Sequence, residues 1–160
     1  MRIGYRVKNM IVDITNEFQE SSTPGVGNIT YGIDYDRSIH NLEILAAEWL
    51  VRTFGGDLVL LTESKRQGEK TPDFEWRGKL WENKNLSTRK FSTVDDQLRK
   101  ANQQIHQSKG GILLDFSGSG ATFEAIVNMV KKSADRRIKE SIPVIVRKKA
   151  EYIVLTQDKK

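Results

Sequence analysis

Cysteine is absent from this chain of 160 residues. Disulfide bonds, thiolate metal sites and a cysteine nucleophile are therefore excluded. The absence suits a reducing cytosol, and it suits equally a domain that travels between compartments. Long apolar runs are also missing, since none approaches the roughly 18 residues that a transmembrane helix needs. The segment Met1–Arg6 has no apolar core, so we expect no secretion signal in the chain as given.

The composition is that of an ordinary soluble globular protein, with 29% charged and 38% hydrophobic residues. A chain of this length suits one domain with a substantial core. We divide it into residues 1–37, an N-terminal extension or a segment that helps the protein enter a cell, and residues 38–160, the main domain. The formal charge of +5 favours a polyanionic partner only weakly, so the distribution of basic residues matters more than their total.

Three helices are predicted where apolar residues recur at helical spacing. The first runs over Ser38–Phe54, with Ser38 as its N-cap and the following glycine pair as its stop. The second runs from Thr93 to about Gln107, and the third from about Thr122 to Ile138. Short apolar runs between them predict strands. These strands are Ile29–Ile33, Leu58–Leu61, Pro72–Trp76, Lys79–Lys84, Ile112–Phe116, Val144–Val146 and Tyr152–Leu155.

The order of these elements predicts the fold class. A local hairpin over residues 72–84 shares the chain with strands that are joined by crossover helices, and a second hairpin turns at Lys148-Lys149. Such a combination is typical of an α/β fold in which a mixed central β-sheet is flanked by helices.

The first hairpin carries the most informative residues. Arg77-Gly78 is its expected two-residue turn, with the glycine free to take a positive φ. This register places Phe74 opposite Trp81 and Asp73 opposite Glu82. The aromatic pair then fills the buried side of the sheet, which supports the register.

Asp73 and Glu82 would then face each other with Cβ atoms roughly 4.5–5.5 Å apart. Two like charges placed so close repel each other, and fold stability alone does not favour them. A divalent cation held between them would explain the arrangement. Lys84 lies two residues beyond Glu82 and therefore points to the same face. The alternative interpretation is a solvated face of the sheet on which Lys84 balances the charge.

Pro72-Asp73 followed by Glu82-Asn83-Lys84 resembles the signature of the PD-(D/E)XK nuclease superfamily. The resemblance implies a restriction-endonuclease-like core. It also implies that Asp73 and Glu82 bind a divalent metal and that Lys84 assists the attacking water. Where the common pattern has a leucine between the acid and the lysine, this chain has Asn83, which faces away from the site.

The resemblance implies one more acid, supplied by the helix that precedes the sheet. That helix offers Glu43 and Glu48. Glu48 has Arg52 four residues later, as in an ordinary surface ion pair. Glu43 has no such partner, so we assign Glu43 to the site.

A narrower resemblance covers about residues 28–120. The Phe-Gly-Gly-Asp end of the first helix, the run 60–63, the stretch 70–84 and the strand 111–117 are similar to the C-terminal nuclease domain of contact-dependent growth inhibition toxins, and to domains of phage head and mobile-element proteins. The resemblance implies a metal-dependent nuclease toxin, often one that cuts transfer RNA, and a cognate immunity protein that neutralises it. It also implies delivery, as the C-terminal part of a larger secreted protein, into the cytoplasm of a target bacterium. A chain that acts alone would instead be cytoplasmic.

Carboxylate ligands favour Mg²⁺ as the cofactor, and Mn²⁺ or Zn²⁺ are alternatives because His40 lies one helical turn from Glu43. His40 is otherwise an ordinary residue at a helix start. Gln97 and Gln104 lie on one flank of the second helix, and some relatives place a glutamine near the metal. The ordinary interpretation of that pair is a polar helix face.

Basic residues gather around the hairpin and the second helix, where we expect them to contact nucleic-acid phosphates. These residues are Arg77, Lys79, Arg89, Lys90, Arg99 and Lys100. The run 147–149 is distant in sequence and is interpreted as a solvated surface. The expected substrate is nucleic acid, with transfer RNA favoured over DNA, and the expected immunity protein is acidic.

Two other functions remain open at the level of sequence. A DNase with the same fold and metal chemistry, in a toxin or in a phage or mobile-element enzyme, would differ only in substrate, because metal-assisted hydrolysis does not need the ribose 2′-hydroxyl. A non-catalytic nucleic-acid-binding module would keep the basic residues and would not depend on Asp73.

Overall fold

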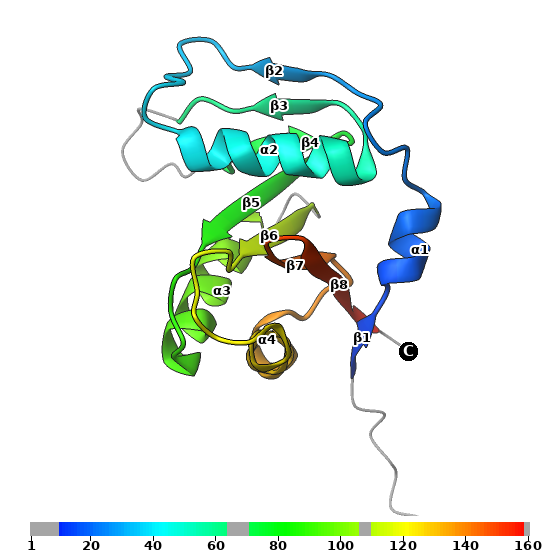
Figure 1. Ribbon diagram of the computed structural model, residues 1–160, viewed down its shortest axis with the longest axis vertical. Coiled ribbons are helices and arrows are strands. Elements are labelled where there is room, and N and C mark those ends of the chain that lie inside the picture. The colour runs from blue at the N-terminus through cyan, green and yellow to red at the C-terminus, as the bar shows by residue number, and fades with distance from the viewer. Residues whose placement is uncertain (1–9, 64–70, 106–109, 159–160) are drawn as a thin grey trace, which may run out of the picture.

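The computed structural model describes residues 10–63, 71–105 and 110–158. Eight strands form one mixed sheet in the order β1-β8-β7-β6-β5-β4-β3-β2, with helices packed on both faces (Figure 1). The predicted α/β class, a mixed sheet flanked by helices, is confirmed. The strands are β1 (Met10–Asp13), β2 (Ile29–Tyr31), β3 (Leu58–Leu60), β4 (Phe74–Trp76), β5 (Lys79–Asn85), β6 (Gly111–Asp115), β7 (Val144–Lys148) and β8 (Glu151–Asp158).

The helices are α1 (Thr15–Glu20), α2 (Asn41–Phe54), α3 (Phe91–Ile105) and α4 (Phe123–Arg137). Strand pairs β5–β6 and β6–β7 are parallel, because α3 and α4 carry the chain back across the sheet between them. The two hairpins, β4–β5 and β7–β8, are antiparallel. No helix in the described residues is long and apolar enough to cross a membrane.

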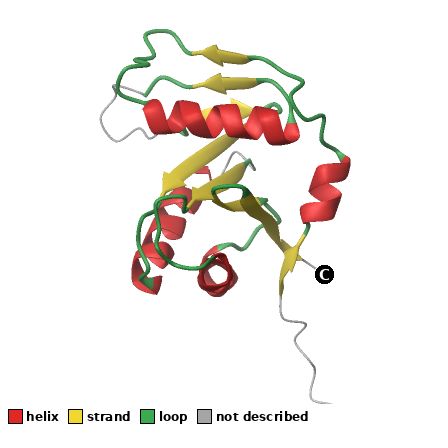
Figure 2. Cartoon of the chain, viewed as in Figure 1, coloured by secondary structure: helices red, strands yellow, loops and turns green. Residues whose placement is uncertain are grey.

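Two apolar cores lie on opposite faces of the sheet, and Figure 2 shows α2 on one side with α3 and α4 on the other. The α2 core is rich in aromatic side chains, because the hairpin directs one face of each strand toward the helix. Its fully buried members include Leu50, Phe54, Phe74 and Trp76. The second core joins aliphatic residues of α3 and α4 to β6 and β7.

The helix boundaries differ from the predictions mainly at their starts. α2 begins at Asn41 and not at Ser38, because the Ser38 backbone N–H and hydroxyl donate to Asp36 Oδ1 (2.9 and 2.5 Å) in a turn before the helix. Its predicted end at Phe54 is confirmed, and Gly55 follows with φ 75°. α3 begins at Phe91, two residues earlier than predicted.

The β7–β8 turn lies one residue later than predicted. Lys148 pairs with Glu151, so Lys149 and Ala150 form the turn, and Lys149 has φ 55°. The prediction of a turn at residues 148–149 was wrong by one residue, because the lysine-rich run gave no glycine or asparagine to fix the position of positive φ.

The described part of the N-terminal segment contributes both edges of the sheet. β1 pairs antiparallel with β8, and β2 pairs parallel with β3. Between them, α1 places Phe18 edge-on against Phe54, with ring centroids 5.0 Å apart. Neither β1 nor α1 was predicted, because residues 7–18 mix apolar and polar side chains without a clean period.

Candidate functional site

The β4–β5 hairpin adopts the predicted register, with Phe74 opposite Trp81. Arg77 and Gly78 form its turn with φ values of 54° and 77°, as a two-residue turn of the primed type requires. The Arg77 guanidinium donates to the Phe54 carbonyl (2.8 Å) and lies over the Trp76 ring (4.8 Å). Arg77, expected to contact nucleic acid, is thus also engaged in holding the turn against the end of α2.

Asp73 lies one residue before β4 and is tied to β5 by two hydrogen bonds. Its backbone N–H donates to the Trp81 carbonyl (3.1 Å), and the Asn83 backbone N–H donates to its Oδ2 (2.7 Å). The Asp73 carboxyl also lies within hydrogen-bonding reach of the Glu82 carboxyl. The structure therefore brings together the two acids that the register predicts.

Glu82 and Lys84 point to the same side of the sheet. Glu82 lies in register with Ile112 and Lys84 with Leu114, and both of these β6 residues belong to the core beneath α3 and α4. The intervening Asn83 lies in register with Leu113, a member of the α2 core, so it faces away as predicted.

Burial and mutual repulsion make these acids hard to ionise. Burial, assisted by the hydrogen bond to Glu82 and its charge, raises the pKa of Asp73 to about 8. Burial also raises the pKa of Glu82, although the hydrogen bond to Asp73 and the Lys84 charge act in the opposite direction. Glu82 is only 2% exposed, and its Oε2 has no hydrogen-bond partner among the described residues. A buried oxygen left in this state calls for a ligand or another functional explanation.

Glu43, in the first turn of α2, is the third acid of this group. Its carboxyl lies within hydrogen-bonding reach of Asp73, and burial followed by the Asp73 charge raises the pKa of Glu43 to about 7. The Tyr35 hydroxyl donates to Glu43 Oε2 (2.8 Å), and His40 Nδ1 lies 3.6 Å from the same oxygen. The structure thus places His40 beside the acid that the sequence analysis assigned to the site.

Tyr35 also lies at this site, and the sequence analysis missed it. Its ring stacks on His40 with centroids 5.0 Å apart, and burial together with its bond to Glu43 raises its pKa above the ordinary value. Tyr35 lies in the loop between β2 and α2, where no periodic pattern connects it to Glu43. An aromatic hydroxyl shortly before the helix was the only signal available.

The acids form a row with Asp73 in the middle. Among the described residues, no three histidine, aspartate or glutamate side chains converge closely enough to enclose a metal ion as they stand. Mg²⁺ does not require such a cage, since it commonly keeps several waters and takes only one or two carboxylates. The paired Asp73 and Glu82, with the unpartnered Glu82 oxygen, fit that requirement.

The other predicted residues lie around this row with varied roles. Arg99 and Lys100 both pair with Asp96, at 2.7 and 3.1 Å. Lys79, Arg89 and Lys90 are exposed. No contact in the described part of the chain joins Gln97 or Gln104 to the three acids, although Gln104 Oε1 is buried without a partner there.

Glu48 also departs from expectation. Within the described residues it makes no ion pair with Arg52, and both side chains instead line a cavity beside α2. The omission of Glu48 from the site is consistent with this placement, although the reason given for it, a surface ion pair, was wrong.

Comparison with known proteins gives one structural likeness. No protein-family model matches the chain, and no curated protein matches its sequence. A chain of the CdiA-CT/CdiI toxin and immunity complex from Burkholderia pseudomallei is similar in structure, with a TM-score of 0.54 and 17% identity. The match covers 82% of this chain and 100% of that chain. At this identity the likeness shows a shared fold, one that occurs in a toxin–immunity complex.

Proposed function

We propose that this chain is a metal-dependent nuclease toxin that hydrolyses phosphodiester bonds. The observation that carries the proposal is the buried meeting of Asp73 and Glu82, two acids that repel each other and leave Glu82 Oε2 without a partner in the described structure. Fold stability does not favour such a pair, whereas a divalent cation would satisfy it.

Asp73 and Glu82 would hold the cation, which we propose to be Mg²⁺, with Mn²⁺ or Zn²⁺ as alternatives. When bound, such an ion supplies charge neutralisation at the phosphate and lowers the pKa of water at the site. Lys84, on the same side of the sheet, orients or deprotonates the attacking water or donates to a phosphate oxygen. Glu43 completes the polar environment, directly or through water, and Tyr35 fixes its orientation.

The biological setting of the proposal is competition between bacteria. The fold likeness to a toxin–immunity complex supports a toxin that acts inside a target bacterium and is neutralised by a cognate immunity protein. Transfer RNA is the proposed substrate, and the exposed Lys79, Arg89 and Lys90 are proposed to contact its phosphates. A basic surface of this kind favours an acidic immunity protein.

The direct test is to incubate the purified chain with total RNA and with plasmid DNA, each with Mg²⁺ or with a chelator. We expect Mg²⁺-dependent cleavage of transfer RNA by the wild type and none by Asp73→Asn. Glu75→Gln is the matched control, because Glu75 is an exposed acid two residues further along the chain whose partner across the hairpin is Leu80 and not an acid. It should cleave like the wild type.

Each other outcome of this test has a defined meaning. Cleavage of plasmid DNA alone would replace the ribonuclease by a DNase of the same chemistry. Cleavage that survives Asp73→Asn would remove the proposed site. Binding of RNA by a wild-type chain that cleaves neither substrate would leave only a nucleic-acid-binding module.

A further inference from the structure

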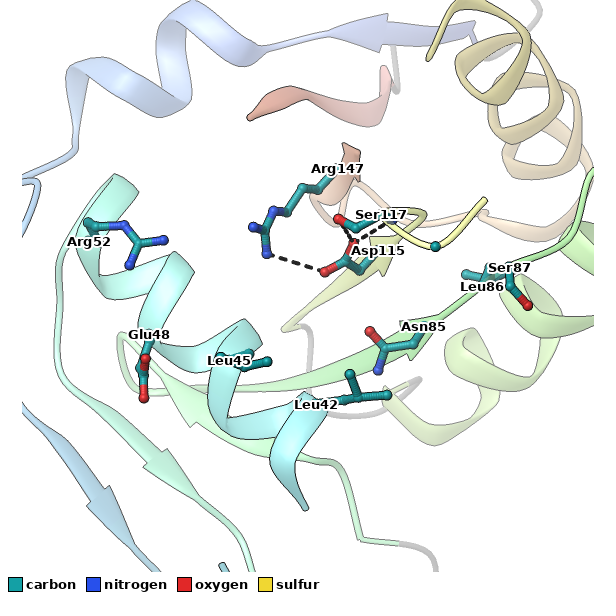
Figure 3. Close-up of a pocket in the computed structure, with 11 residues that line it drawn as sticks. Leu42, Leu45, Glu48, Arg52, Asn85, Leu86, Ser87, Asp115, Ser117 and Arg147 are labelled. Atoms are coloured by element: carbon teal, nitrogen blue, oxygen red, sulfur yellow. Dashed lines mark hydrogen bonds and ion pairs between the residues drawn. The ribbon is translucent and has the colours of Figure 1, made fainter. Parts of the chain in front are cut away.

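A cavity of about 470 Å³ lies between α2 and the ends of β5, β6 and β7 (Figure 3). None of the four candidate catalytic residues lines it. Two of its lining residues, however, are their direct neighbours in the chain: Leu42 precedes Glu43, and Asn85 follows Lys84. Adjacent residues of a strand are only about 3.3 Å apart along its axis. Successive side chains of a strand point to opposite faces, so Asn85 lies on the α2 face with Asn83, whereas Glu82 and Lys84 point to the other face. The cavity therefore lies on the α2 face of the sheet, close in the chain to the candidate catalytic residues.

The walls of the cavity combine an apolar side with a polar one. Leu42 and Leu45 of α2 remain 58% and 49% exposed although they stand next to a hydrophobic core. Opposite them, the Asn85 amide and the Ser117 hydroxyl come from the ends of β5 and β6. A volume of this size, with an apolar surface and a few placed hydrogen-bonding groups, is typical of a small-ligand site.

Two guanidinium groups point into the same space. Figure 3 shows Arg52 of α2 and Arg147 of β7 both directed toward the gap between their elements. Burial lowers the pKa of Arg147, and the charge of Arg52 acts in the same direction, whereas Asp115 at 3.3 Å opposes both. Arg52 has no ion pair among the described residues. Two cations held close together favour an anion between them. Asp115 already fills this role for Arg147, and Glu48 also lines the cavity, so Arg52 is the guanidinium left to bind an anion from outside.

The positive surface continues beyond the cavity. A shallower depression shares Arg52, Ser117 and Arg147 with it and adds Lys149 from the β7–β8 turn. Lys149 is placed there because the turn bends its backbone N–H toward the Ser117 hydroxyl, to which it donates at 2.9 Å. On the α2 face of the sheet, the structure thus offers an apolar cavity, then an arginine pair, then a lysine.

We propose that this cavity binds one nucleotide of a single-stranded RNA segment. The base lies against Leu42 and Leu45, Asn85 supplies its hydrogen bonds, and Arg52 binds the following phosphate beside Arg147. The inference rests on the proposed nuclease function and adds a substrate-binding site to it. A nucleotide is favoured over a protein partner because the space is a concave cavity of ligand size with paired cations at its mouth.

The test measures RNA binding without cleavage, so that it does not depend on activity. A fluorescein-labelled single-stranded RNA of eight nucleotides is titrated, with chelator, into Asp73→Asn and followed by anisotropy. Adding Arg52→Gln should weaken binding by about tenfold. The slope of the logarithm of the binding constant against the logarithm of the salt concentration should also become less steep, by the amount expected for the loss of about one phosphate contact. Leu45→Ala should weaken binding by roughly threefold to tenfold with an unchanged salt dependence, as expected for a lost base contact.

The matched control is Lys131→Gln, which removes one exposed positive charge from α4, away from the cavity. It should leave the affinity for RNA within about twofold of that of Asp73→Asn. One distant charge changes the overall electrostatic attraction between the protein and RNA only slightly. Thermal unfolding of each variant confirms that it is folded. Equal losses for Arg52→Gln and Lys131→Gln would overturn the proposal, and so would unchanged affinity for both Arg52→Gln and Leu45→Ala.

Failure of this site and failure of the nuclease can be distinguished. If the wild type cleaves RNA but the Arg52 and Leu45 variants bind it normally, the cavity is not a substrate site. If the wild type cleaves nothing but RNA binding depends on Arg52 and Leu45, the cavity binds RNA and the catalytic proposal is wrong. If the two variants lose affinity for an acidic immunity protein and not for RNA, the cavity belongs to a protein interface and the proposal is overturned.

Discussion

Two buried acidic sites in this molecule have opposite surroundings. Asp95 of α3 accepts hydrogen bonds from Ser133 (2.9 Å) and from Arg137 at Nε (3.0 Å) and Nη2 (2.6 Å). These contacts lower the pKa of Asp95 to about 2. Asp73 instead meets two further acids, and burial, followed by the hydrogen bond to Glu82 and the Glu82 charge, raises its pKa to about 8. The protein surrounds the first carboxylate with hydrogen-bond donors of its own and places the second beside two other acids.

This difference separates a structural acid from the acid that we propose binds the cation. Asp95 ties α3 to α4 and has no need of anything outside the chain. Asp73 destabilises the metal-free fold through its neighbours Glu82 and Glu43, and strongly perturbed acids of this kind are concentrated at functional sites. The comparison can be tested by changing each acid and measuring activity and stability separately.

The largest expected effect is on activity. Asp73→Ala and Lys84→Ala should each reduce RNA cleavage by at least about 100-fold, because one removes the proposed metal ligand and the other the group proposed to act on the attacking water. Initial rates on transfer RNA with saturating Mg²⁺ measure the loss. Unfolding temperatures should change little. If both variants instead lose much of their metal-free stability, these residues serve the fold and the site is misread.

The next effect is on stability, and it should appear at the other acid. Asp95→Ala leaves Arg137 and Ser133 without their partner, so we expect the free energy of unfolding to fall by about 2 kcal/mol. Urea denaturation measures the change. RNA cleavage below the unfolding transition should stay near the wild-type rate. A loss of cleavage without a loss of stability would mean that Asp95 contributes to the chemistry.

The two sites should also respond to pH in opposite ways. In the unfolded chain Asp73 and Glu43 each have a pKa of about 4. In the metal-free fold burial and neighbouring acids raise the pKa of Asp73 to about 8 and that of Glu43 to about 7. Their contribution to stability is therefore present below pH 4 and is lost as the pH rises toward 8. That of Asp95, with its pKa lowered to about 2, is present above pH 4 and is lost as the pH falls toward 2.

Unfolding temperatures measured with chelator between pH 5 and pH 8 check this difference. The wild type should become less stable over that range, and Asp73→Asn should flatten the trend because it removes the charge at the centre of the group. It should also match or exceed the wild type in stability at pH 8. An equally steep decline in Asp73→Asn would show that other groups cause the trend.

The smallest effect is expected at Tyr35, which acts through Glu43 as a positioning residue. The hydrogen bond from its hydroxyl lowers the pKa of Glu43. Tyr35→Phe should therefore raise that pKa further and shift the acid limb of the pH–rate profile to higher pH. Activity should fall by about tenfold, as for other groups that orient a ligand. A drop in rate with an unshifted pH profile would indicate a merely structural role.

The sequence predicted the centre of the site because local rules fix it. A short turn and one aromatic pair determine the hairpin register, and the register alone brings Asp73 to Glu82. Local rules failed at the start of α2, where hydrogen bonds between two particular side chains compete with helix capping. Ser38 donates two hydrogen bonds to Asp36 Oδ1, so α2 begins after Ser38. Helix propensities do not indicate this contact.

The surroundings of the site depend on tertiary contacts and were not predictable. Arg147 was interpreted as part of a solvated run, yet strand order places β7 beside β6 and brings its guanidinium to Asp115 and Arg52. Tyr35 reaches Glu43 only because the loop before α2 folds back over the first turn of the helix. Such pairings arise from the topology of the sheet and not from spacing along the chain.

The central claim, that a cation belongs between Asp73 and Glu82, is tested most directly by measuring metal binding at pH 8 without substrate. Isothermal titration of Mn²⁺ and Mg²⁺ into the wild type should show one site, release of protons in proportion to the raised pKa values, and a rise in unfolding temperature. Asp73→Asn should lose the binding and Glu75→Gln should keep it. Binding that is equal in the wild type and Asp73→Asn, or a wild type that binds neither ion, would contradict the account.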